Sequence, residues 1–235
     1  MSIIEFYENQ NAVVQEALST LRTNISFAGN NKKIKKLAIV SYNASEGKTT
    51  TSINLSINYA RAGFNTLLID TDMRKSLEYK TYGADVDTGL STVISDKLYM
   101  DQVVRATNIE NLFFLPSGPK HLDPTGYFSS NEFKEFLAKA EKEYDFIILD
   151  TPALGSVIDA AIVASLADAA IMIVSTGRIK MSGFKRARDQ LLKANVNFLG
   201  VVLNKVKKSE YRKYFDIYGY YFKRRIKKKK WSKRK

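Results

Sequence analysis

Short runs of apolar residues recur along the chain, and segments with helical spacing separate most of them. Continuous apolar runs of this kind are typical of parallel strands that are buried on both faces. The runs predict strands at 37–40, 66–69, 112–115, 146–149, 170–174 and 198–203. Apolar spacings of three and four residues predict helices at 10–27, 48–62, 131–143, 157–166 and 182–194. Residues 74–110 are less regular, and the Gly, Pro and Ser residues within 117–130 predict a loop.

The alternation of predicted strands and helices indicates an α/β fold. In such a fold a mostly parallel central sheet is flanked by helices on both faces. We expect one domain over residues 1–207 and a tail over residues 208–235. No apolar run reaches the roughly eighteen residues that a membrane-spanning helix requires. The first residues also lack the pattern of a secretory signal.

Composition and charge narrow the possible chemistry. The chain has no cysteine, which excludes a disulfide scaffold, a thiolate zinc site and a cysteine nucleophile, and a cytoplasmic location fits. The net charge is +13, and residues 223–235 carry ten positive charges and no acid, so the remainder carries +3. Such a block is expected to be disordered until it meets acidic lipid, nucleic acid or phosphate groups. A solvated tail that only aids solubility is an equally open interpretation.

A phosphate-binding loop follows the first predicted strand. Gly47-Lys48-Thr49 at a strand-to-helix turn is the second half of a Walker A motif. Backbone N–H groups from Ser45 to Thr50 are expected to form an anion cradle, with Lys48 on the β- and γ-phosphates and the Thr49 hydroxyl on Mg²⁺. Tyr42 replaces the first glycine of the full motif, so an ordinary helix N-terminus is the alternative for this motif alone.

Three aspartates follow two of the other predicted strands. Asp70 and Asp72 are two residues apart, so on an extended chain their side chains point the same way, and Asp150 ends a run typical of a Walker B strand. Ligands bind at this edge of open parallel sheets. Neighbouring carboxylates repel each other unless a cation lies between them, and Mg²⁺ is the natural candidate. The alternative is a pair of turn-forming aspartates.

Together these motifs resemble the bacterial tyrosine kinases of capsule and exopolysaccharide operons, the BY-kinases, over nearly the whole chain. The likeness includes the helix with Glu16 and Arg22-Thr23-Asn24-Ile25, the loop ending Glu46-Gly47-Lys48-Thr49, and Asp70-Thr71-Asp72-Met73-Arg74, which resembles the second (A′) motif of the family. It continues through residues 89–91, 115–119, 144–152, 159–160 and 200–204. It ends in a cluster of tyrosines, Tyr211, Tyr214, Tyr218, Tyr220 and Tyr221.

The resemblance implies a P-loop NTPase fold of the deviant-Walker type and an autokinase that uses ATP and Mg²⁺. Its expected acceptors are the clustered tyrosines, in a flexible basic tail. Four of these tyrosines are also spaced as one face of a helix, Tyr211, Tyr214, Tyr218 and Tyr221, which is the alternative of a packing stripe.

The implied site residues fall into three groups. Lys48, Asp70 and Asp72 are expected to be catalytic. Asp70 is the candidate to orient or deprotonate the tyrosine hydroxyl, although the sequence leaves the two aspartate roles open. Nucleotide contacts are expected from Ser45, Glu46, Gly47, Lys48, Thr49, Thr50 and, near the adenine, Asn204. Metal contacts are expected from Thr49, Asp72 and Asp150. Arg74 is interpreted either as a contact to the γ-phosphate or the incoming chain, or as an ordinary surface arginine.

The resemblance also implies partners. Family members without a membrane span pair with a membrane-embedded activator that regulates polysaccharide chain length, which would recruit this chain to the inner face of the cell membrane. A cognate tyrosine phosphatase and anionic lipid at the tail are further expected partners. Residues 1–30 are expected to be a helical oligomerisation segment with contacts from Glu16 and Arg22. Ser19 replaces the middle arginine of that motif, which leaves ring assembly open.

Two other classes of function share these features. Partition and septum-site ATPases have the same fold but carry an extra lysine five residues before the Gly-Lys lysine, where this chain has Asn43. That difference favours the kinase. A nucleotide-switched protein that binds membrane or nucleic acid through its basic tail is the non-enzymatic alternative, and an adaptor that binds nucleotide without turnover ranks third.

Overall fold

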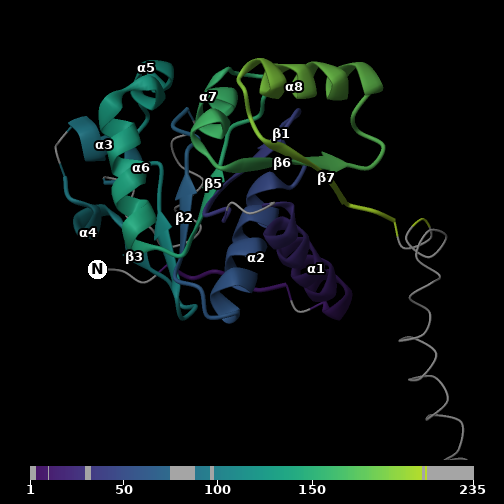
Figure 1. Cartoon of the computed structure of the whole chain (residues 1–235), viewed down its shortest axis with the longest axis horizontal. Helices are drawn as coiled ribbons and strands as arrows, with labels where there is room; N and C mark the ends of the chain where they lie inside the picture. The colour runs from purple at the N-terminus through teal and green to yellow at the C-terminus, as the bar shows by residue number, and fades with distance from the viewer. Residues whose placement is uncertain are drawn as a thin grey trace, which may run out of the picture.

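The computed structural model describes residues 4–9, 11–29, 33–74, 88–95, 98–207 and 210. In this part of the chain seven strands form one sheet in the order β3-β4-β2-β5-β1-β6-β7 (Figure 1). The strands are β1 Lys36–Ser41, β2 Thr66–Asp70, β3 Arg105–Ala106, β4 Leu112–Leu115, β5 Phe146–Asp150, β6 Ala169–Ser175 and β7 Phe198–Asn204. β3 pairs antiparallel with β4, and the other strand pairs are parallel. The expected mostly parallel sheet is therefore confirmed.

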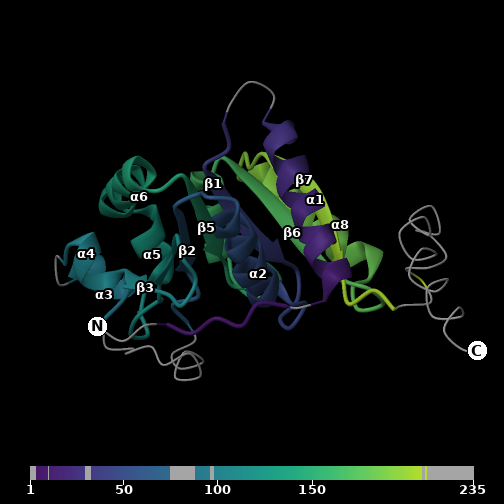
Figure 2. The same cartoon turned by 90° about the horizontal axis from the view of Figure 1, so that it is seen from below.

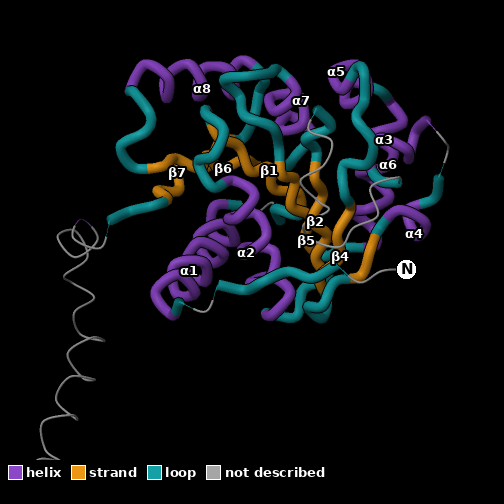
Figure 3. The backbone as a smooth tube through the Cα atoms, turned by 180° about the vertical axis from the view of Figure 1, so that it is seen from behind, coloured by secondary structure: helices purple, strands orange, loops and turns teal. Residues whose placement is uncertain are grey.

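Helices cover both faces of this sheet, as Figures 2 and 3 show. α1 and α2 pack on one face, and α6, α7 and α8 on the other. β1 is buried on both faces because Leu37 and Ile39 enter one core while Ala38 and Val40 enter the other. The helices are α1 Ala12–Ala28, α2 Lys48–Arg61, α3 Leu90–Ser95, α4 Met100–Val103, α5 Pro124–Ser129, α6 Asn131–Glu143, α7 Asp159–Leu166 and α8 Met181–Lys193.

One predicted loop is partly wrong. Residues 117–130 were expected to lack regular structure because of their Gly, Pro and Ser content, yet α5 lies within them. Asp123 caps this helix by accepting a hydrogen bond from the amide of Gly126, and Pro124 occupies its first turn, where a missing N–H costs nothing. The six predicted strands and five predicted helices are confirmed, with ends that shift by a few residues.

α1 is joined to α2 by polar contacts as well as by its apolar face. The Arg22 guanidinium donates to the side-chain carbonyl of Asn58 at 2.8 Å, and the Asn58 amide donates to the hydroxyl of Ser19 at 3.1 Å. Glu16 lies on the exposed side of the same helix. Two residues of the expected oligomer motif, Ser19 and Arg22, thus hold α1 onto its own domain, and the contacts between copies remain a prediction.

Candidate active site

The loop between β1 and α2 folds around its own side chains. Glu46 is fully buried, and its carboxylate accepts a hydrogen bond from the backbone amide of Asn43 at 3.1 Å. Ser45 and Gly47 adopt positive φ values of 60° and 90°. A side chain at Gly47 would be strained at this φ, and its Cβ would lie 2.1 Å from Nδ2 of Asn204, which would have to shift. Glu46 therefore shapes the loop with its side chain, and its contact with the nucleotide remains a prediction.

The end of β5 meets the start of α2 in a tight polar cluster. Asp150 is 4% exposed, and its carboxylate accepts hydrogen bonds from the Thr49 hydroxyl at 2.6 Å and the Ser52 hydroxyl at 3.0 Å. The Lys48 ammonium lies 3.5 Å from the same carboxylate. The structure thus brings Lys48 and Thr49 together with Asp150, which lies about a hundred positions further along the sequence. Ser52 completes the cluster, and no motif in the sequence pointed to it.

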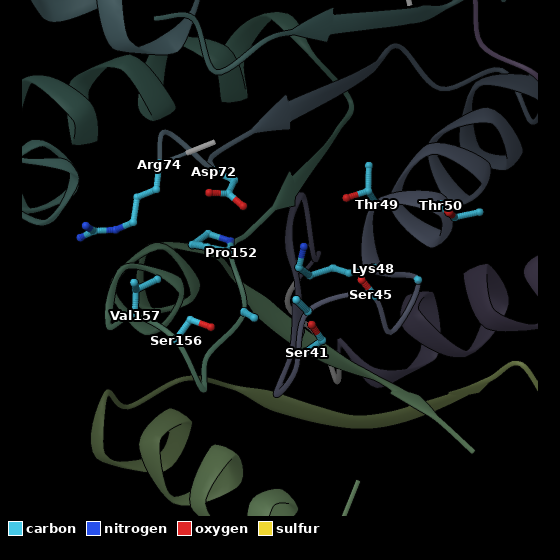
Figure 4. A pocket seen from close by; sticks show the side chains of 13 residues that line it. Ser41, Ser45, Lys48, Thr49, Thr50, Asp72, Arg74, Pro152, Ser156 and Val157 are labelled. Carbon is cyan, nitrogen blue, oxygen red and sulfur yellow. The ribbon is translucent and has the colours of Figure 1, made fainter. Parts of the chain in front are cut away.

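The two A′ aspartates occupy different positions. β2 ends at Asp70, and the amide of Met73 then donates to the carbonyl of Thr71 as the chain leaves the strand. Asp70 is 2% exposed and accepts a hydrogen bond from the amide of Asp72 at 2.9 Å. Asp72 itself lines a cavity, with its carboxylate directed into it (Figure 4). Asp70 therefore fixes the turn that presents Asp72.

That cavity, with a volume of about 320 Å³, lies beside the phosphate-binding loop. Lys48 and Thr49 face it from one side and Asp72 from another, as Figure 4 shows. Further lining residues come from the loop and from the segment after β5: Ser41, Ala44, Ser45, Gly47, Thr50, Arg74, Pro152, Ala153, Ser156 and Val157. The carboxyl ends of three adjacent strands, β2, β5 and β1, therefore meet at one polar cavity, as expected of an open parallel sheet.

Arg74 is anchored at the edge of this cavity. Its guanidinium forms two contacts with the carboxylate of Asp159, at 2.6 and 3.2 Å, and points away from Lys48 (Figure 4). Asp159 is 1% exposed and also accepts a hydrogen bond from the Thr125 hydroxyl at 2.8 Å. The hydrogen bond that the guanidinium donates to Asp159 raises the pKa of Arg74. Arg74 is thus no ordinary surface arginine, and the roles of Asp159 and Thr125 were missed because α7 and α5 are distant in sequence.

Asn204 and the tyrosine cluster complete the expected set. Asn204 ends β7, and its side-chain amide donates to the carbonyl of Glu46 at 2.9 Å. A contact with adenine remains a prediction. The five clustered tyrosines lie outside the described residues.

The donor set fits a magnesium ion. The part of the chain that the structure describes contains no group of three or more His, Cys, Asp or Glu side chains placed to hold a metal ion. Mg²⁺ does not need one, because it binds through one or two carboxylates together with substrate phosphates and water. The carboxylates of Asp72 and Asp150 and the hydroxyl of Thr49 are oxygen ligands of the kind it prefers.

Comparison with known proteins places this site in a family. Residues 34–199 match a family described as an AAA domain. The chain is 37% identical to the tyrosine-protein kinase CpsD of Streptococcus agalactiae, over 97% of this chain and 99% of that protein. It is 35% identical to the tyrosine-protein kinase YwqD of Bacillus subtilis, over 88% and 85%. The chain belongs to the bacterial tyrosine kinases. The resemblance read from the motifs is confirmed.

Solved structures agree with this assignment. The kinase domain of the Escherichia coli tyrosine kinase ETK has a TM-score of 0.78 and 26% identity, and covers 83% of this chain and 76% of its own. The chimerical protein CapA2B2 has a TM-score of 0.79, 26% identity, and coverages of 88% and 95%. The septum-site protein MinD of Pyrococcus horikoshii, complexed with Mg-ADP, has a lower TM-score of 0.61 with 26% identity, over 75% and 72%. The P-loop fold shared with MinD is therefore confirmed, and the bacterial tyrosine kinases are the better match.

Proposed function

We propose that this chain is a protein-tyrosine autokinase of capsule or exopolysaccharide synthesis, which uses Mg²⁺-ATP to phosphorylate its C-terminal tyrosine cluster. The observation that carries the proposal is the contact of Lys48 and Thr49 with Asp150, beside a cavity that Lys48, Thr49 and Asp72 line. The similarity to named tyrosine kinases over nearly the full chain supports the same activity.

Phosphoryl transfer needs alignment and charge neutralisation more than covalent chemistry from the protein. Different residues of the site supply these two requirements. Lys48 and the amides of the loop bind the β- and γ-phosphates. Thr49, Asp72 and Asp150 would hold Mg²⁺, which supplies positive charge to the transferring phosphoryl group. The tyrosine oxygen attacks the γ-phosphorus as its proton passes to a carboxylate of the site, for which Asp72 is the candidate. The bond to the bridging oxygen breaks, and ADP leaves.

Position distinguishes the two A′ aspartates in this mechanism. Asp72 lines the cavity, whereas Asp70 is buried and bonded to the amide of Asp72. This arrangement supports Asp72 as the carboxylate that meets metal or tyrosine, with Asp70 holding it in place. We thereby revise the expectation that Asp70 receives the hydroxyl proton.

The partners follow from the family. The described part of the chain contains no helix long and apolar enough to cross a membrane. We propose that a membrane-embedded activator recruits the chain to the inner face of the cell membrane and that the basic tail adds contacts to anionic lipid. A tyrosine phosphatase would reverse the modification. Homo-oligomer formation through residues 1–30, including Glu16 and Arg22, would bring the tail of one copy to the site of another.

The test is mass spectrometry of residues 208–235 after incubation with Mg²⁺-ATP, with and without the cytoplasmic segment of the activator. We expect phosphate on the clustered tyrosines in the wild type and none in Lys48→Met. A protein that binds ATP under these conditions but never acquires phosphotyrosine would instead be a nucleotide-switched binding protein.

A further inference from the structure

The end of β7 touches the back of the phosphate-binding loop at two backbone carbonyls. The side-chain amide of Asn204 donates to the carbonyl of Glu46 at 2.9 Å, and the ammonium of Lys205 donates to the carbonyl of Ser45, also at 2.9 Å. Neither Asn204 nor Lys205 lines the cavity that Lys48 and Thr49 face. These two side chains therefore hold the loop from outside the site.

The direction of these carbonyls fixes the direction of two amides. In a trans peptide unit, the C=O of one residue and the N–H of the next point in opposite directions. All peptide bonds in the described part of the chain are trans. With the carbonyls of Ser45 and Glu46 held toward β7, the N–H groups of Glu46 and Gly47 point away from β7. Ser45 and Gly47 line the cavity and Asn204 and Lys205 do not, so this direction is the one that a phosphate-binding loop needs for its amides to form an anion cradle.

The two residues that the contact joins, Lys205 and Ser45, both have an unusual backbone conformation. Lys205 has a φ of 55° and Ser45 a φ of 60°, values that non-glycine residues rarely adopt. At the Lys205 end, Oδ1 of Asn204 accepts a hydrogen bond from the Lys205 amide at 2.8 Å. Thr176, just after β6, adds a hydroxyl bond to the carbonyl of Lys205 at 3.0 Å and an amide bond to the carbonyl of Asn204 at 3.1 Å. A strained backbone that several hydrogen bonds hold in place is typical of functional positions.

We propose that Asn204 and Lys205 are positioning residues that clamp two loop carbonyls and so orient the phosphate-binding amides of Glu46 and Gly47. The inference rests on the proposed nucleotide site. It assigns Asn204 a role that is independent of adenine, and it assigns a role to Lys205, a residue in no nucleotide-binding motif of the sequence. The donor from Lys205 is charged, which makes its hydrogen bond to a carbonyl stronger than a neutral one.

The experiment measures the affinity of the full chain for a fluorescent ATP analogue with Mg²⁺ and for tripolyphosphate, which has no adenine, as its competitor. We expect Lys205→Met and Asn204→Ala each to weaken both ligands by about three- to tenfold, as loss of one hydrogen bond that orients the site predicts. Lys205→Arg, which keeps a charged donor, should restore most of the affinity. Lys207→Met removes the same charge from the same exposed segment and is the matched control, expected to bind as the wild type does.

Each result has a distinct meaning. If Lys205→Met binds both ligands as tightly as Lys207→Met does, the clamp is overturned. If Asn204→Ala weakens the ATP analogue but not tripolyphosphate, Asn204 is an adenine contact and its part in the clamp is overturned. If the wild type binds neither ligand, or Lys48→Met binds as well as the wild type, the proposed function fails and the clamp fails with it. Melting temperatures without ligand confirm that each variant is folded.

Discussion

The guanidinium of Arg74 and the carboxylate of Asp159 form a two-point ion pair between the turn after β2 and the first residue of α7. The pair is asymmetric, because the side chain of Asp159 is 1% exposed while that of Arg74 is 42% exposed. The buried carboxylate of Asp159 therefore depends on the more exposed guanidinium of Arg74 to balance its charge. Thr125 supplies a further hydrogen bond to Asp159, so three segments of the domain converge on one carboxylate at the edge of the site.

This asymmetry predicts the effect of removing the arginine. Arg74→Gln leaves Asp159 buried without its cation, and we expect the free energy of unfolding to fall by about 1–3 kcal/mol. Arg188→Gln is the control, because Arg188 pairs with Asp189 on the surface at 3.1 Å and exposed pairs contribute about 0–1 kcal/mol. Urea denaturation measures both. Equal losses in the two variants would show that Asp159 does not need Arg74.

The Thr49 hydroxyl provides a test of the metal site. Thr49→Val removes the group that bonds Asp150 at 2.6 Å while keeping the shape of the side chain. We expect the Mg²⁺ concentration for half-maximal autophosphorylation to rise about tenfold or more, which is the scale of losing one metal-site contact. Thr51→Val is the matched control, since its hydroxyl bonds the carbonyl of Gly47, the N-cap of the same helix, and not Asp150. An unchanged Mg²⁺ requirement in Thr49→Val would remove Thr49 from the metal site.

Alanine substitutions at Gly47 and Gly63 distinguish the effect of backbone strain on stability from an effect on nucleotide binding. Both have φ near 90°, but a Cβ at Gly47 meets Asn204 at 2.1 Å, whereas one at Gly63 meets nothing within 4 Å. Each alanine variant should lose roughly 1–2 kcal/mol of stability from the left-handed conformation. Only Gly47→Ala should also weaken nucleotide binding, by about three- to tenfold, because the displaced Asn204 no longer holds the carbonyl of Glu46. Stability comes from urea denaturation and binding from titration with a fluorescent ATP analogue. Similar binding by both variants would contradict the close packing of this loop.

The sequence predicted the elements better than it predicted the contacts between them. The strands were predictable because runs such as 37–40 are buried on both faces and so carry a signal that needs no tertiary knowledge. The α5 helix was missed because Gly126 and the serines around it favour a loop. Asp123 followed by Pro124 is nevertheless a recognisable start of a helix.

In the candidate site, too, the individual residues were easier to predict from the sequence than the contacts between them. Lys48, Thr49 and Asp150 were predictable because each belongs to a motif at the end of a strand. The Arg74–Asp159 pair spans 85 residues and the Lys205–Ser45 contact spans 160, and no local pattern encodes either. The different positions of Asp70 and Asp72 depend on a turn just after β2, which a model of an extended chain could not anticipate.

Tyr144 predicts how stability falls at alkaline pH. Burial, together with the charge of Glu143, raises its pKa from 10.0 to about 12 in the folded protein. The unfolded chain therefore loses this proton first, and stability should fall as pH rises from about 10 to about 12. Below that window the contribution is fully present.

Tyr144→Phe keeps the ring that packs edge-on against Phe113 and removes the titrating group, so its stability curve should be flatter in this window. Tyr99→Phe is the control, because Tyr99 is 76% exposed. Urea denaturation at several pH values gives the curves, and parallel declines in the wild type and Tyr144→Phe would assign the alkaline loss to other groups.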